Sequence, residues 1–167
     1  MTIPIRVKLV MERPPELTIR EWRTATKAST AEMGRRWHSK YARLHFTPQA
    51  EKRYGYKPRT TRYKRNKRKL AERGKVQSGG VVPLVFSGLL REALLTHATI
   101  RSFPTRATVV MTVPRYVKQR PQGNRPYLAA EATMVIEEEA AELSDFLERR
   151  VVERVNQVRA SKQIQVG

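Results

Sequence analysis

The chain has 167 residues, of which 34 are Lys or Arg and 15 are Asp or Glu, giving a formal net charge of +19. This length suits one domain with a real hydrophobic core. The absence of cysteine excludes disulfides, a thiol nucleophile and cysteine-based zinc sites. Since no signal-peptide pattern and no run of about 18 apolar residues occurs, we expect a soluble, unexported, single domain over 1–167 without a membrane partner.

The first element expected is a strand over 3–11, where apolar residues alternate with polar ones. From about Leu17 the apolar spacing changes to three and four, which predicts a helix of roughly 28 residues reaching Leu44. Thr18 followed by Glu21 has the spacing of an N-terminal capping box. The apolar stripe of this helix includes Trp22, Met33, Trp37 and Tyr41, and either core packing or an oligomer contact would use it.

The segment 47–80 comes next and carries most of the charge. Between Lys52 and Lys75 there are twelve Lys or Arg and one acid, Glu72, so this stretch alone contributes +12 − 1 = +11. It is rich in Gly and Pro and poor in apolar residues, although Thr60–Arg73 could form a short helix. We therefore expect an extended, basic and flexible loop insertion that becomes ordered when it meets a partner.

The charge of this segment indicates a polyanionic partner or an acidic protein surface. Tyr54, Tyr56 and Tyr63 lie among the cations, and phosphate contacts combined with base stacking would use both residue types. A merely solubilising loop is the other interpretation. The residues expected to contact DNA or an acidic partner are Lys57, Arg59, Arg62, Lys64, Arg65, Lys67, Arg68, Lys69, Arg73 and Lys75.

After the basic segment, Leu84-Val85-Phe86 suggests a short extended piece, with Ser87 as the N-cap of a helix. Leu84, Phe86, Leu89 and Leu90 are expected to hold the end of the basic segment in the core. Two strands should follow, about Thr99–Phe103 and Arg106–Val113, joined by a turn at Pro104. The sheet is therefore expected to be small and mostly antiparallel.

A second long helix is predicted over 128–160, on which Leu143, Leu147 and Val151 continue an apolar stripe at helical spacing. Its early turns are acidic and its end is basic, an order that suits the helix macrodipole. Together these elements predict an α+β fold in which a small, mostly antiparallel sheet packs against two long helices. The stripe residues would form the core or an oligomer contact.

Little in the sequence indicates catalysis. His38 and His45 are seven residues apart, a rise of about 10 Å along a helix, which is too far for one metal ion. Consecutive acids such as Glu137, Glu138, Glu139 and Glu142 point in different directions around a helix, so they form a charged face. A metal-dependent nuclease is the competing interpretation of these acids. We predict no enzyme activity, no catalytic or metal site and no cofactor.

The order of elements resembles a known family. The residues that carry the likeness are Pro83-Leu84-Val85-Phe86-Ser87-Gly88-Leu89-Leu90-Arg91, which follow the Lys/Arg-rich stretch, and Arg125-Pro126-Tyr127-Leu128 before the last helix. They are similar to segments of the tail-completion, or virion-morphogenesis, proteins of tailed bacteriophages. The likeness spans most of residues 1–130.

The resemblance implies a non-enzymatic virion structural protein, acting as a tail-completion, tail-terminator or neck protein. It would form a homo-oligomeric ring, commonly sixfold, at the head–tail junction or the top of the tail, after assembly in the host cytoplasm. Its partners would be the neighbouring head–tail connector and tail-tube proteins, and genomic DNA touched non-specifically in the channel. The alternative is a cellular nucleic-acid-binding protein, ribosome- or nucleoid-associated, that uses the basic segment.

Overall fold

The fold is α+β, with helix packed on the sheet. The computed structural model describes residues 2–6, 14, 16–77, 82–85, 87–112 and 128–166. These residues divide into two compact units. Unit 1 contains His38–Thr99 and Val110–Ile136, and unit 2 contains Thr2–Trp37, Ile100–Val109 and Glu137–Gly167. The single domain over 1–167 remains a prediction.

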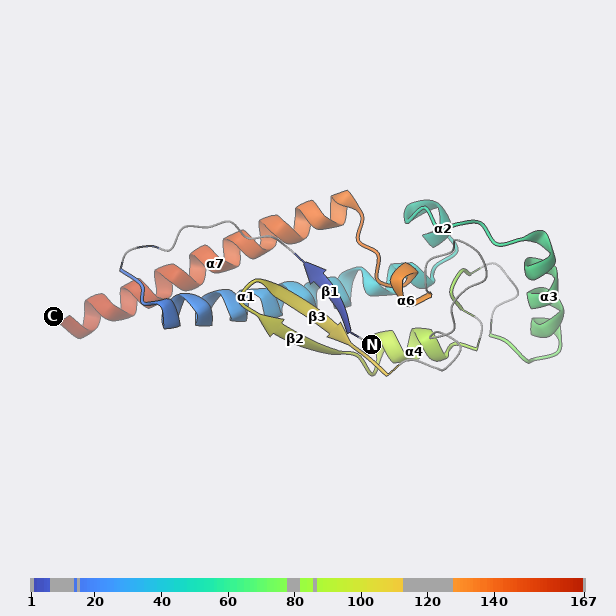
Figure 1. The fold of residues 1–167 in the computed structure, drawn as a ribbon, viewed down its shortest axis with the longest axis horizontal. Helices are drawn as coiled ribbons and strands as arrows, with labels where there is room; N and C mark the ends of the chain where they lie inside the picture. Colours follow the sequence, from blue (N-terminus) through green and yellow to red (C-terminus); the bar gives the residue numbers. More distant parts are fainter. Residues whose placement is uncertain are drawn as a thin grey trace. The chain divides into compact units, whose positions relative to one another are not determined.

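Unit 2 is built on a sheet of three strands in the order β1-β3-β2. They are β1 (Thr2–Arg6), β2 (Thr99–Phe103) and β3 (Arg106–Val110). The predicted hairpin is confirmed, because β2 and β3 are consecutive antiparallel neighbours with the turn at Pro104, and in Figure 1 β3 runs opposite to β1 as well. The rest of the first predicted strand, 7–11, and Val113 lie outside the described residues.

Helix α1 (Ile19–Lys40) packs on this sheet in unit 2. The capping box that starts it is confirmed: the backbone N–H of Thr18 donates to Glu21 Oε2 at 2.8 Å, and the backbone N–H of Glu21 donates to Thr18 Oγ1 at 3.2 Å. The Thr30 hydroxyl donates to the carbonyl of Phe103 at 2.6 Å, which ties the helix to β2. The predicted stripe faces the core here, with Met33 and Trp37 fully buried.

At Gly34 the backbone of α1 lies close against the sheet. A Cβ placed there would lie 2.7 Å from Ile100 Cγ2 and 2.9 Å from the Cβ of Ala107. We expect Gly34→Ala to lower the free energy of unfolding by about 1–2 kcal/mol, because overpacking outweighs the gain in helix propensity. Urea denaturation measures this. The double variant with Ala107→Gly should recover part of the loss, and a gain in stability from Gly34→Ala alone would contradict the close contact.

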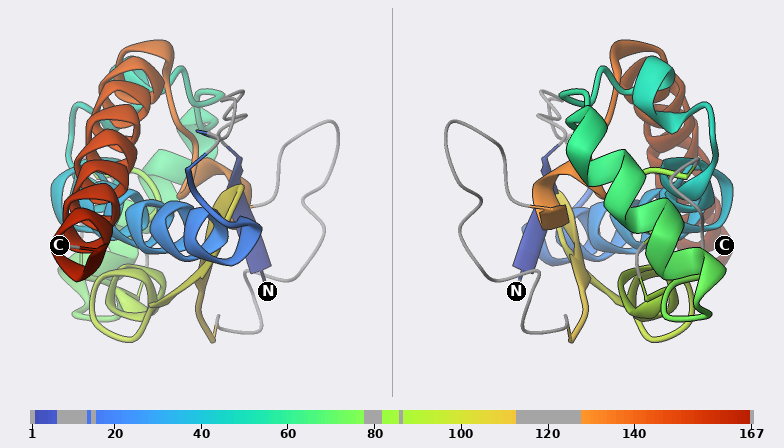
Figure 2. Two further views of the ribbon diagram at one scale, coloured as in Figure 1. Left: turned by 90° about the vertical axis from the view of Figure 1, so that its left-hand side faces the viewer. Right: turned by 90° about the vertical axis from the view of Figure 1, so that its right-hand side faces the viewer.

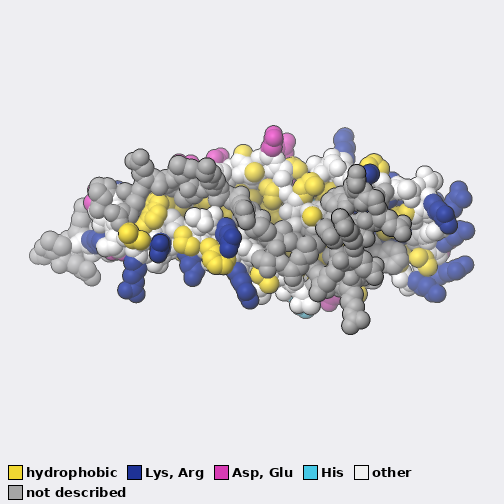
Figure 3. All heavy atoms as spheres, viewed as in Figure 1, with side chains coloured by type: hydrophobic (Ala, Val, Ile, Leu, Met, Phe, Trp, Pro, Cys, Tyr) yellow, Lys and Arg dark blue, Asp and Glu magenta, His cyan; other side chains and the backbone are white. Residues whose placement is uncertain are grey.

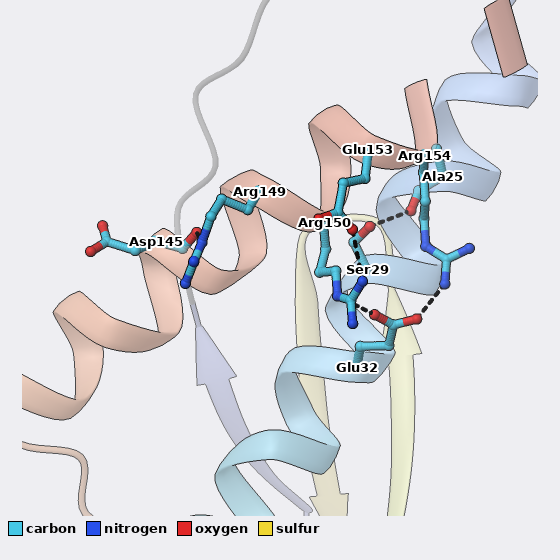
Figure 4. Close-up of polar contacts among 8 residues, drawn as sticks. All are labelled: Ala25, Ser29, Glu32, Asp145, Arg149, Arg150, Glu153 and Arg154. Atoms are coloured by element: carbon cyan, nitrogen blue, oxygen red, sulfur yellow. Dashed lines mark hydrogen bonds and ion pairs between the residues drawn. The ribbon is translucent and has the colours of Figure 1, made fainter. Parts of the chain in front are cut away.

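Helix α7 (Glu137–Val166) runs antiparallel to α1 in unit 2. Ion pairs join Arg36 to Glu142 (2.8 Å) near one end of the pair and Glu21 to Lys162 (2.8 Å) at the other. Between them, Glu32 pairs with Arg150 (3.1 Å) and Arg154, as Figure 4 shows. These ion pairs match the antiparallel order of the two helices at three places along their length.

The buried stripe of α7 recurs at steps of four, which is the ridge spacing of packed helices. It consists of Glu139, Leu143, Leu147, Val151 and Val155, each at most 5% exposed. The expected acidic face over 137–142 is therefore wrong at one position, since Glu139 is 1% exposed. Because the buried positions recur every four residues, Glu139 lies on the packed side of α7 together with Leu143. Glu137 and Glu138 are exposed.

Both long helices differ from their predicted bounds. The first was expected to reach Leu44, but α1 ends at Lys40 and a 3-10 helix, η1 (Ala42–Phe46), follows. Its three residues per turn place both Ala42 and His45 in the core. The second, expected as one helix over 128–160, is divided into α6 (Leu128–Glu131) and α7. The β-branched residues Thr133, Val135 and Ile136 occupy the break, and such residues have low helix propensity.

Unit 1 contains the basic segment, which is more ordered than an extended loop. The helices α2 (Ala50–Arg53) and α3 (Thr61–Glu72) occupy much of 47–77, so the predicted loop is wrong there and the suggested short helix is confirmed. The physical reason is local anchoring, because Ala50, Tyr54, Tyr56 and Val76 are all buried. Residues 78–80 lie outside the described part, and flexibility remains a prediction.

The segment that carries the family resemblance also lies in unit 1 and leads into α4 (Leu89–Leu95). Its N-cap is Gly88, with a left-handed φ of 82°, and not Ser87 as predicted. Leu84 has a φ of 61°, so the expected extended piece is a turn. Leu90 and Leu94 are the core anchors of α4, whereas Leu89 is 49% exposed; Phe86 lies outside the described residues.

Candidate polyanion-binding surface

The strongest candidate site is the outward side of α3, which we call the α3 cation face. At about 100° per residue, its four cations fall within about 120° of one another around the helix. All four side chains are exposed; they are Arg62, Arg65, Arg68 and Lys69. The opposite side of α3 is the packed one, with Lys67 buried and Leu70 and Ala71 half-buried. Figure 2 (right) shows α3 along its whole length, and Figure 3 shows Lys and Arg gathered over it.

Part of this charge opposes the stability of the helix. Thr60 caps α3 by accepting a hydrogen bond from the backbone N–H of Tyr63, but the first turn contains no acid and does contain Arg62. A cation near a helix N-terminus is unfavourable by about 0.3–1 kcal/mol, and like charges three or four residues apart repel one another. Lys69 lies in the last turn, where a cation is favourable, so the cost comes from Arg62 and from repulsion between neighbouring cations.

Of the ten predicted contact residues, seven are exposed and make no ion pair among the described contacts. Those seven are Lys57, Arg62, Arg65, Arg68, Lys69, Arg73 and Lys75. Lys64 is also exposed but lies 3.8 Å from Glu51. The predicted surface therefore comes together on α3 and its two flanks.

Two of the predicted contact residues are structural instead. The Lys67 side chain is 3% exposed and its Nζ donates to the carbonyl of Val82 at 2.9 Å. Burial, and secondly the charge of Arg59, lower the pKa of Lys67. Arg59 pairs with Glu131, whose side chain is fully buried. The prediction that Lys67 and Arg59 contact a partner is therefore wrong. Lys67 holds α3, and Arg59 holds the residues just before α3, against the rest of unit 1.

The tyrosines of the basic segment were expected to stack on bases, but two of them are core residues. Tyr54 and Tyr56 are 3% and 4% exposed, and Tyr54 stacks on His45 with ring centroids 3.9 Å apart. The Tyr56 hydroxyl donates to the carbonyl of Glu131 at 2.8 Å, so it accepts from His45 Nδ1–H. Only Tyr63, 42% exposed, is placed for stacking.

His45 and Glu131 were missed as anchors of this surface, and burial decides their role. His45 is fully buried, and desolvation lowers its pKa to about 4. The ring is therefore neutral in the folded protein at pH 7. No pattern in the sequence separates these two residues from ordinary surface groups.

The lowered pKa of His45 predicts a pH-dependent stability. The unfolded chain gains a proton on His45 below about pH 6.5, whereas the folded chain gains it only near pH 4, so stability falls as pH drops through this window. We expect the folded state to lose about 2 kcal/mol between pH 7 and pH 5 from this group. Urea unfolding at both values measures it.

Two variants isolate this contribution. His45→Gln should be less stable at pH 7 but should lose this part of the pH slope. His97→Gln is the matched control, because His97 is exposed and should leave the slope unchanged. An unaltered slope in His45→Gln would show that another group causes the pH dependence.

Six of the seven predicted stripe residues belong to the core. Five of the stripe residues, Met33, Trp37, Leu143, Leu147 and Val151, are at most 1% exposed, Tyr41 is 4% exposed, and Trp22 is half-buried. Among the described residues, no group of three His, Asp or Glu is placed to share a metal ion. None of the helices over the described ranges is long and apolar enough to cross a bilayer.

Comparison of the chain with protein-family models, curated protein sequences and solved structures gave no match.

Proposed function

We propose that this chain is a non-enzymatic structural protein of a tailed-phage virion, a tail-completion, tail-terminator or neck protein that forms a ring joining the tail to the head connector. The observation that carries the proposal is the α3 cation face. It presents Arg and Lys on a packed helix in a chain of net charge +19. A ring around a DNA channel requires attraction to phosphates without reading the base sequence, and Lys and Arg contacts to phosphates provide this.

Further support comes from the segment whose residues resemble the phage family. Val85 and Leu90 are 3% and 1% exposed, so this stretch is fixed in the core on both sides of the turn at Gly88. Helix α3 is tied to the residue just before this stretch through the hydrogen bond from Lys67 to the carbonyl of Val82. A ring protein would thereby hold its polyanion-binding helix on a rigid base.

The test is the composition of purified virions. Mass spectrometry of intact particles and of separated heads and tails should find the chain in a few copies per particle, with a loss of joined particles when its gene is removed. A chain that is absent from purified virions, and whose deletion leaves particle assembly unchanged, would overturn the proposal.

The second candidate is a cellular nucleic-acid-binding protein, which the α3 cation face favours equally. It would bind duplex DNA or RNA with an affinity that falls steeply as the salt concentration rises. Co-sedimentation with ribosomes or nucleoid in uninfected cells would favour this function over the virion protein.

A further inference from the structure

Unit 2 carries a hollowed basic surface that the proposed function does not use. It lies along the first turns of α1, between that helix and the β2–β3 turn, with a volume of about 700 Å³. Arg20, Arg23 and Lys27 line it together with Ile19 and Ala28. A second hollow of about 330 Å³ adjoins it toward the end of α7 and shares Arg20, Thr24 and Ala28. Glu21 and Arg154 also line this second hollow. We call the two together the α1 groove.

The α1 groove combines charge with exposed apolar surface. Ile19 is 59% exposed, and Pro104 adds apolar surface from the β2–β3 turn. Arg20 lies in the first turn of α1, where the macrodipole disfavours a cation. An acidic helix with small side chains matches such a groove better than a bare polyanion does.

Unit 2 also carries a surface of that kind. The first three turns of α7 expose four acids on one side of the helix, and we call this side the α7 acid face. Its acids are Glu137, Glu138, Asp145 and Glu148, with Ala141 among them, and all five side chains are exposed. Figure 3 shows Asp and Glu side chains gathered over the beginning of α7.

The helix macrodipole explains only part of the α7 acid face. Glu137 and Glu138 lie in the first turn, where acids stabilise a helix. Asp145 and Glu148 lie two to three turns further along, beyond the reach of that effect. Among the described contacts none of the four acids makes an ion pair with a Lys or Arg, whereas Glu142 beside them pairs with Arg36.

The two surfaces lie at opposite ends of the antiparallel helix pair. The groove follows the start of α1, which is ion-paired to the end of α7 through Glu21 and Lys162. The α7 acid face begins at the other end, where Glu142 meets Arg36. One chain therefore cannot bring its own acid face into its own groove, but a second copy can.

The α1 groove and the α7 acid face are also similar in length. The groove runs from Ile19 to Ala28, about 14 Å of helix, and the acid face runs from Glu137 to Glu148, about 17 Å. We propose that the α7 acid face of one copy docks in the α1 groove of the next, so that copies associate head to tail. Such a heterologous contact closes into a ring when its rotation permits. The inference deepens the ring of the proposed function by assigning its contact.

The test is an intermolecular disulfide in the full-length chain, which has no cysteine of its own. One preparation carries Thr24→Cys in the groove and a second carries Ser144→Cys beside the acid face. After mixing and mild oxidation, we expect a mixed disulfide dimer on a non-reducing gel. Asn156→Cys is the control partner, because it is exposed on α7 beyond the acid face, and it should give at least about fivefold less dimer.

Charge reversal then tests the pairing itself. The groove-reversed variant carries Arg20→Glu, Arg23→Glu and Lys27→Glu together with Thr24→Cys. The face-reversed variant carries Glu137→Lys, Glu138→Lys, Asp145→Lys and Glu148→Lys together with Ser144→Cys. Each reversed preparation mixed with an unreversed partner should give about fivefold less dimer, and the two reversed preparations mixed together should restore the yield.

Restoration shows that both reversed variants are folded, and circular dichroism melting checks each one separately. No dimer between the unreversed preparations, or a yield indifferent to charge reversal, would overturn the contact. A dimer that forms only when DNA is added, and equally with the Asn156→Cys control, would show that DNA gathers the copies and would overturn the contact. Virion incorporation without the disulfide contradicts this contact alone, whereas the disulfide without incorporation contradicts the proposed function alone.

Discussion

Replacing Arg62, Arg65, Arg68 and Lys69 by glutamine should sharply weaken binding to a random-sequence DNA duplex. Each phosphate contact that is lost lowers the slope of log affinity against log salt by about 0.9, so removing four contacts lowers it by up to about 3.6. At low salt the affinity should fall about tenfold or more, and equally for any DNA sequence, because phosphate contacts carry no base information. Fluorescence anisotropy across a salt series measures both quantities.

A control with the same change in charge separates this surface from the general charge of the chain. Arg35, Arg43, Arg101 and Arg106 are also exposed and lie outside α3. Their replacement by glutamine removes four charges but should change the salt slope much less. Equal effects of the two quadruple variants would mean that the net charge, and not the α3 cation face, attracts the polyanion.

Replacing Arg59 by methionine should cause the largest loss of stability of any single change considered. It leaves the fully buried carboxylate of Glu131 without its ion-pair partner, and breaking a buried pair from one side costs about 3–5 kcal/mol. The loss should appear as a lower midpoint of urea unfolding followed by tryptophan fluorescence and circular dichroism.

The double variant Arg59→Met with Glu131→Leu should recover most of this stability, because it removes the buried charge together with its partner. Arg62→Met is the matched control, since Arg62 is exposed on the same segment, and it should change stability by less than about 0.5 kcal/mol. A double variant as unstable as Arg59→Met alone would show that packing, and not the ion pair, holds α3 in place.

Local patterns predicted the elements whose causes are local. The capping box needs only Thr18 and Glu21, three residues apart, and the hairpin needs only alternating strands around Pro104. Both are confirmed. The helix over Thr61–Glu72 is confirmed for the same reason. The helix ends were predicted less well, because tertiary packing chose a 3-10 helix after Lys40 and a break before Glu137.

For the candidate surface, too, part was predictable from the sequence and part only from the structure. Composition located it within 52–75, since charge can be counted without a structure. Composition did not show which cations reach solvent. Lys67 and Arg59 look identical to their neighbours in sequence, yet one is buried against Val82 and the other pairs with Glu131, 72 residues away.

The sequence by itself determined the concentration of positive charge, the α+β class and the short-range caps and turns, because these depend on residues within a few positions of one another. Only the tertiary structure decided that Tyr54 and Tyr56 are core residues, that His45 is a neutral buried base, and that four cations share one exposed side of α3. The reason is that burial depends on segments far apart in the chain, as when the Tyr56 hydroxyl meets the carbonyl of Glu131 across 75 residues.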